Sequence, residues 1–386
     1  MEFALTEDQR SFQQAARDFA ERALAPHAAH WDADEVFPRE AIAQAGALGF
    51  CGLYTPPQWG GLGLTRLDAA IVFEELAAGC TSTTAYLTIH NMATWMLARW
   101  GHPELCDAWV PALARGERLA SYCLTEPQAG SDAASLRTQA ARRGDHYVLN
   151  GSKAFISGAG ETDLLVVMAR TGGAGPGGIS AFAVPARTPG VAFGKKEQKM
   201  GWNSQPTRAI SFDDVEVPLT HRLGDEGEGF AIAMKGLDGG RINIATCSVG
   251  TAQAALNRAQ AHLNERTQFG RELAQFQALQ FKLADMLTEL VAARQMVRLA
   301  AWKLDGGSPD ATAYCAMAKR FASDAGFMVA NEALQLHGGY GYIREYPLER
   351  HVRDTRVHQI LEGTNEIMRV IVARAVLREG ATETLR

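Results

Sequence analysis

The sequence lacks the patterns that mark several broad classes of protein. Its 386 residues contain six cysteines with no C-x-x-C pair among them, and the H-E-x-x-H motif does not occur. We therefore expect free thiols in a reducing compartment, with neither a disulfide framework nor a metal site. A net charge of −5 gives no basis for binding nucleic acid or an anionic membrane surface.

Targeting and membrane-spanning patterns are missing as well. Residues 1–8, MEFALTED, are acidic and have no apolar segment, so we expect no signal or transit peptide. This favours the cytoplasm for a bacterial protein, or the mitochondrial matrix for a processed eukaryotic form. The charge-free run 76–98 is long enough to cross a bilayer, but it holds six Ser or Thr residues plus His90 and Asn91. We interpret it as a buried helix that lines something polar.

The pattern of apolar residues divides the chain into three parts. Residues 1–120 have helical periodicity that begins after the capping box Thr6-x-x-Gln9. Residues 121–228 change to short apolar runs separated by turns, and residues 229–386 return to longer amphipathic helices. We expect a mainly α protein with a β insert: an N-terminal helical domain, a small middle β-barrel or sandwich, and a C-terminal four-helix bundle.

Two glycine-containing segments of the middle region give specific predictions. Asn150-Gly151 lies between apolar runs and is a strong signal for a β-hairpin turn. The segment Gly173-x-Gly175-x-x-Gly178 matches the dinucleotide-binding fingerprint, but the residues after it predict a strand instead of a helix. We therefore interpret it as a hairpin loop.

The stretch 358–369, HQILEGTNEIMR, places one carboxylate between an apolar pair and a glycine. Ile360 and Leu361 indicate a partly desolvated setting, which would raise the pKa of Glu362 and suit it to take a proton near neutral pH. Thr364 is a credible N-cap for a helix over residues 365–378, whose first N–H groups would face an anion. From these residues alone, an ordinary surface glutamate beside a capped helix is the commoner arrangement.

Four further segments could face a ligand, and each also has an ordinary structural interpretation. Residues 122–132, YCLTEPQAGSD, form a strand that ends in a polar loop or a plain turn. Phe155 in 151–158 is an aromatic platform or a core residue. Arg266 in 265–271 fits a pyrophosphate or a solvated charge. The glycines of 335–342, QLHGGYGY, allow a close backbone approach or simply stop a helix.

Together and in this order, these segments resemble the acyl-CoA dehydrogenase family, flavoproteins that oxidise acyl-CoA thioesters to 2-enoyl-CoA. The resemblance covers essentially the whole chain and implies FAD as cofactor, an acyl-CoA substrate, electron-transferring flavoprotein as acceptor and a homotetramer. Segments 79–86, 150–160, 201–208 and 239–244 most resemble members that oxidise isobutyryl-CoA in valine breakdown. The alternatives are 2-methylbutyryl-CoA or butyryl-CoA as substrate, an acyl-CoA oxidase, and a non-catalytic flavin- or CoA-binding assembly protein.

The resemblance also implies roles for individual residues. Glu362 matches the catalytic base that removes the α-proton. Flavin-ring contacts match Tyr122, Leu124, Thr125, Ser131, Phe155, Ile156 and Ser157. Contacts to the pyrophosphate and adenosine part match Arg266, Gln268, Phe269 and Gln277, joined by Gln335, His337, Gly338 and Gly339 of a neighbouring subunit and by Thr364, Asn365 and Glu366. Substrate-side positions match Ser131, Asp238, Arg241, Leu361, Gly363 and Arg374.

Two positions depart from the family pattern. Some members carry the base on the helix near 239–241, but Gly240 has no carboxylate, which leaves Glu362 as the supported candidate and Asp238 as a poor second. Several straight-chain enzymes have Tyr before the base, where this chain has Leu361. The smaller side chain would give room to a methyl branch, although a pocket distinguishes one methylene by only about 1–3 kcal/mol. Met92 and Trp95 are further candidate walls of the acyl pocket.

Overall fold

In the computed structural model, which describes residues 4–380, the N-terminal region is built from helices. They are α1 (Glu7–Phe19), a π-helical turn (Ala20–Leu24), α2 (Ala28–Ala33), α3 (Arg39–Ala47), α4 (Arg66–Gly79), α5 (Thr81–Trp100) and α6 (Pro103–Ala114). Thr6 and Gln9 form the predicted capping box, because each side chain accepts a hydrogen bond from the backbone N–H of the other.

The charge-free run 76–98 divides between the end of α4 and most of α5. Residues 81–94 are all buried, and most of their polar side chains find partners inside the protein, although the hydroxyls of Thr84 and Thr94 have none within residues 4–380. Asn91 accepts from the N–H of Leu53 and donates to the carbonyl of Phe50, at 2.9 and 2.8 Å. Over residues 4–380, no helix is both long enough and apolar enough to cross a membrane. The interpretation as a buried helix beside polar groups is confirmed.

The middle region forms one eight-stranded sheet. Its strands are β1 (Ala120–Cys123), β2 (Gln139–Arg143), β3 (His146–Ser157), β4 (Leu164–Arg170), β5 (Ile179–Pro185), β6 (Val191–Phe193), β7 (Thr207–Pro218) and β8 (Arg222–Leu223). The order is β6-β7-β3-β2-β4-β5-β8, and β1 pairs with β4 in parallel. Along β4, alternate side chains belong to two different hydrophobic clusters, so both faces of the strand are covered. The loop 173–178 joins the antiparallel strands β4 and β5, which confirms the predicted hairpin.

The hairpin predicted at Asn150-Gly151 is wrong. Strand β3 passes straight through this pair, and the turn between β2 and β3 lies at Gly144 and Asp145. The Asn150 amide instead bonds across to β7, donating to the Asp214 carboxylate and accepting from the Asp214 N–H, both at 2.9 Å. The pairing register between β3 and β7 shifts at this point. The Asn-Gly pair therefore forms an irregularity inside a long strand instead of a turn.

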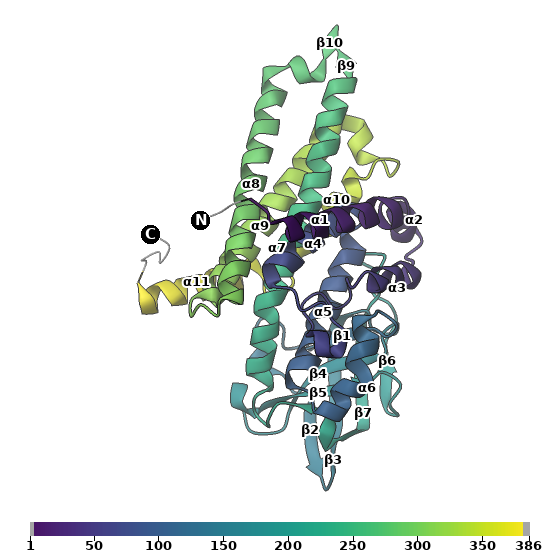
Figure 1. The fold of residues 1–386 in the computed structure, drawn as a ribbon, viewed down its shortest axis with the longest axis vertical. Coiled ribbons are helices and arrows are strands. Elements are labelled where there is room, and N and C mark those ends of the chain that lie inside the picture. The colour runs from purple at the N-terminus through teal and green to yellow at the C-terminus, as the bar shows by residue number, and fades with distance from the viewer. Residues whose placement is uncertain (1–3, 381–386) are drawn as a thin grey trace.

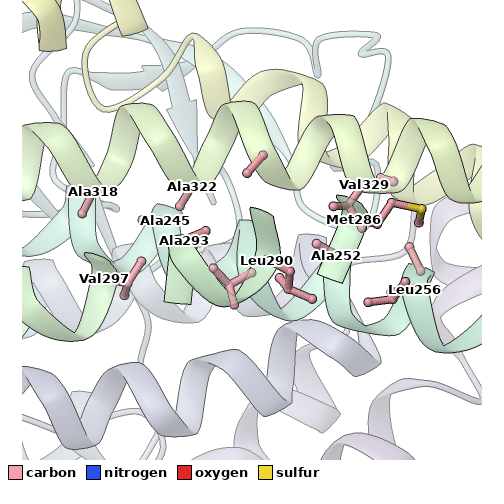
Figure 2. Close-up of a cluster of buried hydrophobic side chains, with 14 of the residues drawn as sticks. Ala245, Ala252, Leu256, Met286, Leu290, Ala293, Val297, Ala318, Ala322 and Val329 are labelled. Carbon is pink, nitrogen blue, oxygen red and sulfur yellow. The ribbon is translucent and has the colours of Figure 1, made fainter. Parts of the chain in front are cut away.

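The C-terminal region is a bundle of long helices. It contains α7 (Gly229–Glu265), the short hairpin β9 (Thr267–Gln268) and β10 (Arg271–Glu272), α8 (Gln277–Asp305), α9 (Ala311–His337), a 3₁₀ segment (Gly338–Tyr342), α10 (Leu348–Arg356) and α11 (Asn365–Glu379). Figure 2 shows Leu256, Met286, Leu290, Val297 and Val329 packed with small alanine side chains between α7, α8 and α9. The predicted order of helices, β insert and helical bundle is confirmed.

Helix α7 runs from the sheet to the far tip of the molecule, where the β9–β10 hairpin lies (Figure 1). At 1.5 Å per residue, its 37 residues extend about 55 Å. Its interior glycines would cost about 1 kcal/mol each in an isolated helix. At Gly250 the reason is close packing, since a Cβ there would lie 2.1 Å from the Glu74 carbonyl oxygen of α4. The helix thereby connects two distant parts of the fold.

Candidate active site

A cavity of about 350 Å³ lies where the three regions meet. Its volume falls in the range of small-molecule sites. Its walls come from α5, from β1 and the loop after it, from the end of β3, from the first turns of α7 and from residues 361–371. The cavity therefore collects segments that are more than 200 residues apart in the sequence.

The structure brings eleven of the predicted residues together in this cavity. All seven predicted flavin-ring residues line it: Tyr122, Leu124, Thr125, Ser131, Phe155, Ile156 and Ser157. Four predicted catalytic or substrate-side residues join them: Arg241, Leu361, Glu362 and Gly363. Phe155 is 70% exposed although it is a large apolar side chain, so one face of its ring is open to a planar partner.

Glu362, the predicted base, lines the cavity, and its setting suits a base. Burial raises the pKa of its carboxyl to about 7, although Arg241 and Lys319 oppose the rise. Its Oε2 is buried and has no hydrogen-bond partner among the described residues. The backbone of Glu362 is left-handed, with φ of +57°, and Gly363 follows with φ of +90°. A non-glycine residue in this conformation is uncommon and typical of functional sites.

The cavity also presents polar atoms that lack partners within residues 4–380. These atoms are Tyr122 Oη, Trp202 Nε1, Arg241 Nε and Glu362 Oε2, each of them buried and each on a residue that lines the cavity. Buried polar groups are normally hydrogen-bonded, so four unsatisfied atoms around one space indicate a polar ligand. The open aromatic face of Phe155 completes a site that fits a flavin ring and a thioester.

A buried ion pair fixes the two strand ends that carry the flavin-ring residues. Lys153 Nζ lies 2.7 Å from Glu126 Oε1, and both side chains are almost fully buried. Lys153 also donates to the carbonyl of Leu124 at 3.1 Å, and Glu126 accepts from the N–H groups of Arg137 and Thr138 at 2.6 and 2.9 Å. Burial alone would raise the pKa of Glu126, but Lys153 and these donors lower it.

Two predicted substrate-side residues do not line the cavity. Asp238 lies one turn before Arg241 on α7 and accepts from its Nη1 at 2.7 Å and from the Thr312 hydroxyl at 2.7 Å. It therefore orients Arg241 and is a poor candidate for a base. Arg374 lines an adjacent hollow of about 200 Å³ with Thr312 and Ile371, and Ile371 lines both spaces.

The predicted pyrophosphate and adenosine contacts lie elsewhere, at the hairpin end of the bundle (Figure 1). This group comprises Arg266, Gln268, Phe269, Gln277, Gln335, His337, Gly338 and Gly339. Arg266 lies over the Tyr340 ring at 5.6 Å, and Phe269 is 94% exposed. Arg241 and Arg266 belong to the same helix and its cap, 25 residues apart, which corresponds to about 38 Å. One molecule of cofactor cannot contact both ends of the same chain.

The start of α11 behaves partly as predicted. Thr364 caps the helix, because its hydroxyl accepts from the N–H of Ile367 at 3.3 Å. Glu366 is exposed. The Asn365 side chain is buried and bonded within the protein, to Lys319, Ser323 and Asp324. Its amide therefore anchors the loop to α9.

Several wall residues were not singled out from the sequence. They are Ile89, Ala133, Ala134, Trp202, Phe230, Met234, Leu237, Ile367 and Ile371. Of the predicted acyl-pocket walls, Leu361 and the helix α5 contribute, through Ile89, whereas Met92 is buried in the core. The backbone of Trp202 is left-handed, with φ of +56°, and its backbone N–H donates to the Asp354 carboxylate at 2.6 Å.

The structure also explains why Gly240 lacks a side chain. A Cβ at this position would lie 2.4 Å from Glu362 Oε2. The carboxylate of Glu362 therefore occupies the space that a side chain from this turn of α7 would enter. A base at position 240 and a base at position 362 are alternative occupants of one volume.

Three consecutive parts of the chain match the domains of one family. Residues 6–117 match the acyl-CoA dehydrogenase N-terminal domain, residues 121–215 the middle domain and residues 227–377 the C-terminal domain. The mitochondrial isobutyryl-CoA dehydrogenase of Bos taurus is 56% identical over 375 residues, which are 97% of this chain and 90% of that protein.

Solved structures of similar proteins superpose over nearly their whole length. The butyryl-CoA dehydrogenase of Megasphaera elsdenii has a TM-score of 0.95 and 41% identity, covering 98% of this chain and 100% of that one. A chain from a structure described as the electron-transferring flavoprotein of Acidaminococcus fermentans has a TM-score of 0.96 and 43% identity, with the same coverage. The chain described here belongs to the acyl-CoA dehydrogenase family.

Proposed function

We propose that this chain oxidises isobutyryl-CoA to methacrylyl-CoA. The family gives the reaction class and FAD as the cofactor. The observation that carries the proposal is the Glu362 carboxyl group, which lies in the cavity with one unpaired oxygen and a pKa of about 7. A carboxyl group with that pKa can take a proton at physiological pH.

Each group in the cavity then has a role. Glu362 takes the α-proton as the Cα–H bond breaks, and its backbone N–H would donate to the thioester oxygen of a bound substrate, where a donor stabilises the developing enolate. Arg241, oriented by Asp238, keeps a positive charge beside the base. FAD, when bound, accepts the β-hydrogen as hydride. One proton and one hydride leave the substrate, and a Cα–Cβ double bond forms.

The shape of the cavity near Glu362 supports a short, branched acyl group. Leu361, Ile89 and Trp202 belong to one apolar cluster beside the base. Trp202 closes this side, whereas Leu361 leaves more room than a tyrosine would. The bovine relative named for isobutyryl-CoA also supports this choice. The same chemistry on 2-methylbutyryl-CoA or butyryl-CoA is the alternative.

Anaerobic mixing with acyl-CoA thioesters tests the proposal. We expect isobutyryl-CoA to bleach the flavin absorbance faster than its straight-chain isomer butyryl-CoA, and roughly 10-fold faster than 2-methylbutyryl-CoA, which has one more methylene. Faster bleaching by a straight chain would contradict the branch preference. A yellow protein that no acyl-CoA bleaches would favour the non-catalytic alternative, and rapid reoxidation of the reduced flavin by O₂ would indicate an oxidase.

We further propose that electrons pass to an electron-transferring flavoprotein and that the reaction belongs to valine breakdown. The structural relative described as such a flavoprotein supports the acceptor. The proposed substrate, isobutyryl-CoA, supports the assignment to valine breakdown. In a bacterium the protein would act in the cytoplasm, and in a eukaryote in the mitochondrial matrix; the bovine relative is named as mitochondrial.

The distance between the two groups of predicted cofactor residues supports an oligomer. Because Glu362 lies beside Gly240 in the first half of α7 and Arg266 caps its far end, a complete FAD site would take the hairpin end of a neighbouring chain. We propose a homotetramer. Sedimentation of the FAD-loaded protein should give about four times the mass of one chain, and a fully active monomer would contradict the shared site.

A further inference from the structure

Helix α9 places a buried lysine directly beneath the segment that carries Glu362. Lys319 has no exposed surface. Its Nζ donates to the carbonyl oxygen of Gly363 at 2.7 Å and to Asn365 Oδ1 at 3.0 Å. Lysine is almost never fully buried without specific partners, so this arrangement calls for an explanation.

The two acceptors of Lys319 belong to a strained turn. Glu362 and Gly363 are consecutive left-handed residues, and the conformation of a non-glycine residue there costs on the order of 1–3 kcal/mol. Such a conformation persists only where surrounding contacts impose it. The Gly363 carbonyl held by Lys319 is part of that turn. The Asn365 amide ties the same turn to α9 through Ser323 and Asp324, at 3.0 and 2.8 Å.

The electrostatic surroundings of Lys319 favour an effect on the base. The titratable groups that face it are Glu362 and Glu366 from the turn, Asp324 from α9, Arg241 from α7 and His358 from the segment before the turn. Burial lowers the pKa of Lys319 to about 8, and Glu362 opposes this, so Lys319 stays largely protonated at neutral pH. Burial, followed by Lys319, lowers the pKa of His358 to about 3, so His358 is neutral. Arg241 and Lys319 are the two cations that act on Glu362.

We infer that Lys319 is a positioning residue for the base: its ammonium group holds the Glu362–Gly363 turn through the Gly363 carbonyl and supplies a charge that favours the carboxylate form of Glu362. This inference rests on the proposed role of Glu362. Lys319 does not itself line the cavity and contacts its wall through Gly363, so its effect passes through the turn and through the electric field.

Replacing Lys319 with Gln keeps a hydrogen-bond donor and removes the charge, whereas replacing it with Arg keeps the charge. In Lys319→Gln we expect the pH at which flavin reduction reaches half its maximum to rise by about one unit, which lowers the rate at pH 7 roughly fivefold. The Lys319→Arg variant should keep the wild-type inflection, and so should Lys195→Gln, which removes an exposed lysine. The rate of Lys319→Gln should recover at high pH.

A second readout does not depend on turnover. The infrared carboxylic-acid band that disappears between wild type and Glu362→Gln reports the protonation of Glu362 directly. We expect this band to persist to a higher pH in Lys319→Gln. An unchanged band and an unchanged rate profile in a folded Lys319→Gln protein would overturn the inference while leaving Glu362 as the base.

If Lys319→Gln does not fold, the Asn365→Ala variant tests the holding role of Lys319 instead. This change removes one of the two acceptors of Lys319 but leaves its charge, so we expect slower reduction at every pH with no displacement of the inflection. A wild-type rate would overturn the holding role. If no acyl-CoA reduces the wild-type flavin, the proposed function fails, and the inference about Lys319 falls with it.

Discussion

The Glu362→Gln variant should bind FAD normally and lose reduction of the flavin by isobutyryl-CoA. Glutamine has nearly the same shape as glutamate, so it fits the space beside Gly240, but its amide cannot take a proton at physiological pH. General bases contribute roughly 10²–10⁴-fold to rate, and we expect a loss of at least this size because Glu362 is the proposed base for the α-proton. Anaerobic stopped-flow absorbance measures the rate, and the flavin-to-protein absorbance ratio measures FAD content.

The pH dependence of flavin reduction in the wild-type protein is a second test of Glu362 as the base. With a pKa of about 7, Glu362 is the active carboxylate above that pH and neutral below it, so the rate should rise as pH increases through about 7. In Glu104→Gln, which changes an exposed glutamate on α6, both the rate and its pH dependence should stay unchanged. Normal reduction in Glu362→Gln would remove Glu362 from the mechanism.

Replacing Lys153 with Met should destabilise the protein strongly. The change leaves the Glu126 carboxylate buried without its counter-charge, and breaking a buried pair in this way costs about 3–5 kcal/mol. Lys153 also holds the carbonyl of Leu124, so the walls on either side of Phe155 should loosen and FAD should bind more weakly. Urea unfolding at fixed FAD concentration measures the first effect, and FAD titration of the apoprotein the second.

A surface ion pair provides the matched comparison. Arg115 and Glu117 form a pair of similar length, 2.7 Å, but both side chains are more than half exposed. Solvent-exposed pairs contribute little, so Arg115→Met should leave the unfolding midpoint and the FAD affinity unchanged. In the double variant Lys153→Met/Glu126→Gln we expect part of the lost stability to return, because no buried charge is left unpaired. Equal stability of Lys153→Met and wild type would refute the anchoring role.

Local patterns in the sequence predicted the order of helices, β insert and helices because the signals are themselves local. The capping box at Thr6, the cap at Thr364 and the loop 173–178 each depend on residues within one turn. The prediction at Asn150-Gly151 failed because the deciding contacts, with Asp214, come from a strand 64 residues away. The domain boundaries at 120/121 and 228/229 stay a prediction.

Prediction of the site residues was limited in the same way, because it depended on signals near each residue in the sequence. Glu362 was found through its apolar neighbours and through family resemblance. Lys319 was missed because a lysine in an alanine-rich amphipathic helix looks like an ordinary surface charge, and only the fold shows that it is buried against the Gly363 carbonyl. Trp202 lies in one of the segments that resemble the family, but nothing local indicates that it faces a cavity formed with α5 and residue 361.

The length of α7 has a consequence for mixtures of subunits. If each FAD site takes Glu362 from one chain and Arg266 from its neighbour, a two-fold pair of chains shares two such sites reciprocally. A chain defective at position 362 and a chain defective at position 266 would then form a hybrid in which one site collects both defects and the other collects none. Two inactive alleles would then complement each other, because one site of the hybrid would be active. Such complementation would show that the FAD sites are shared between chains.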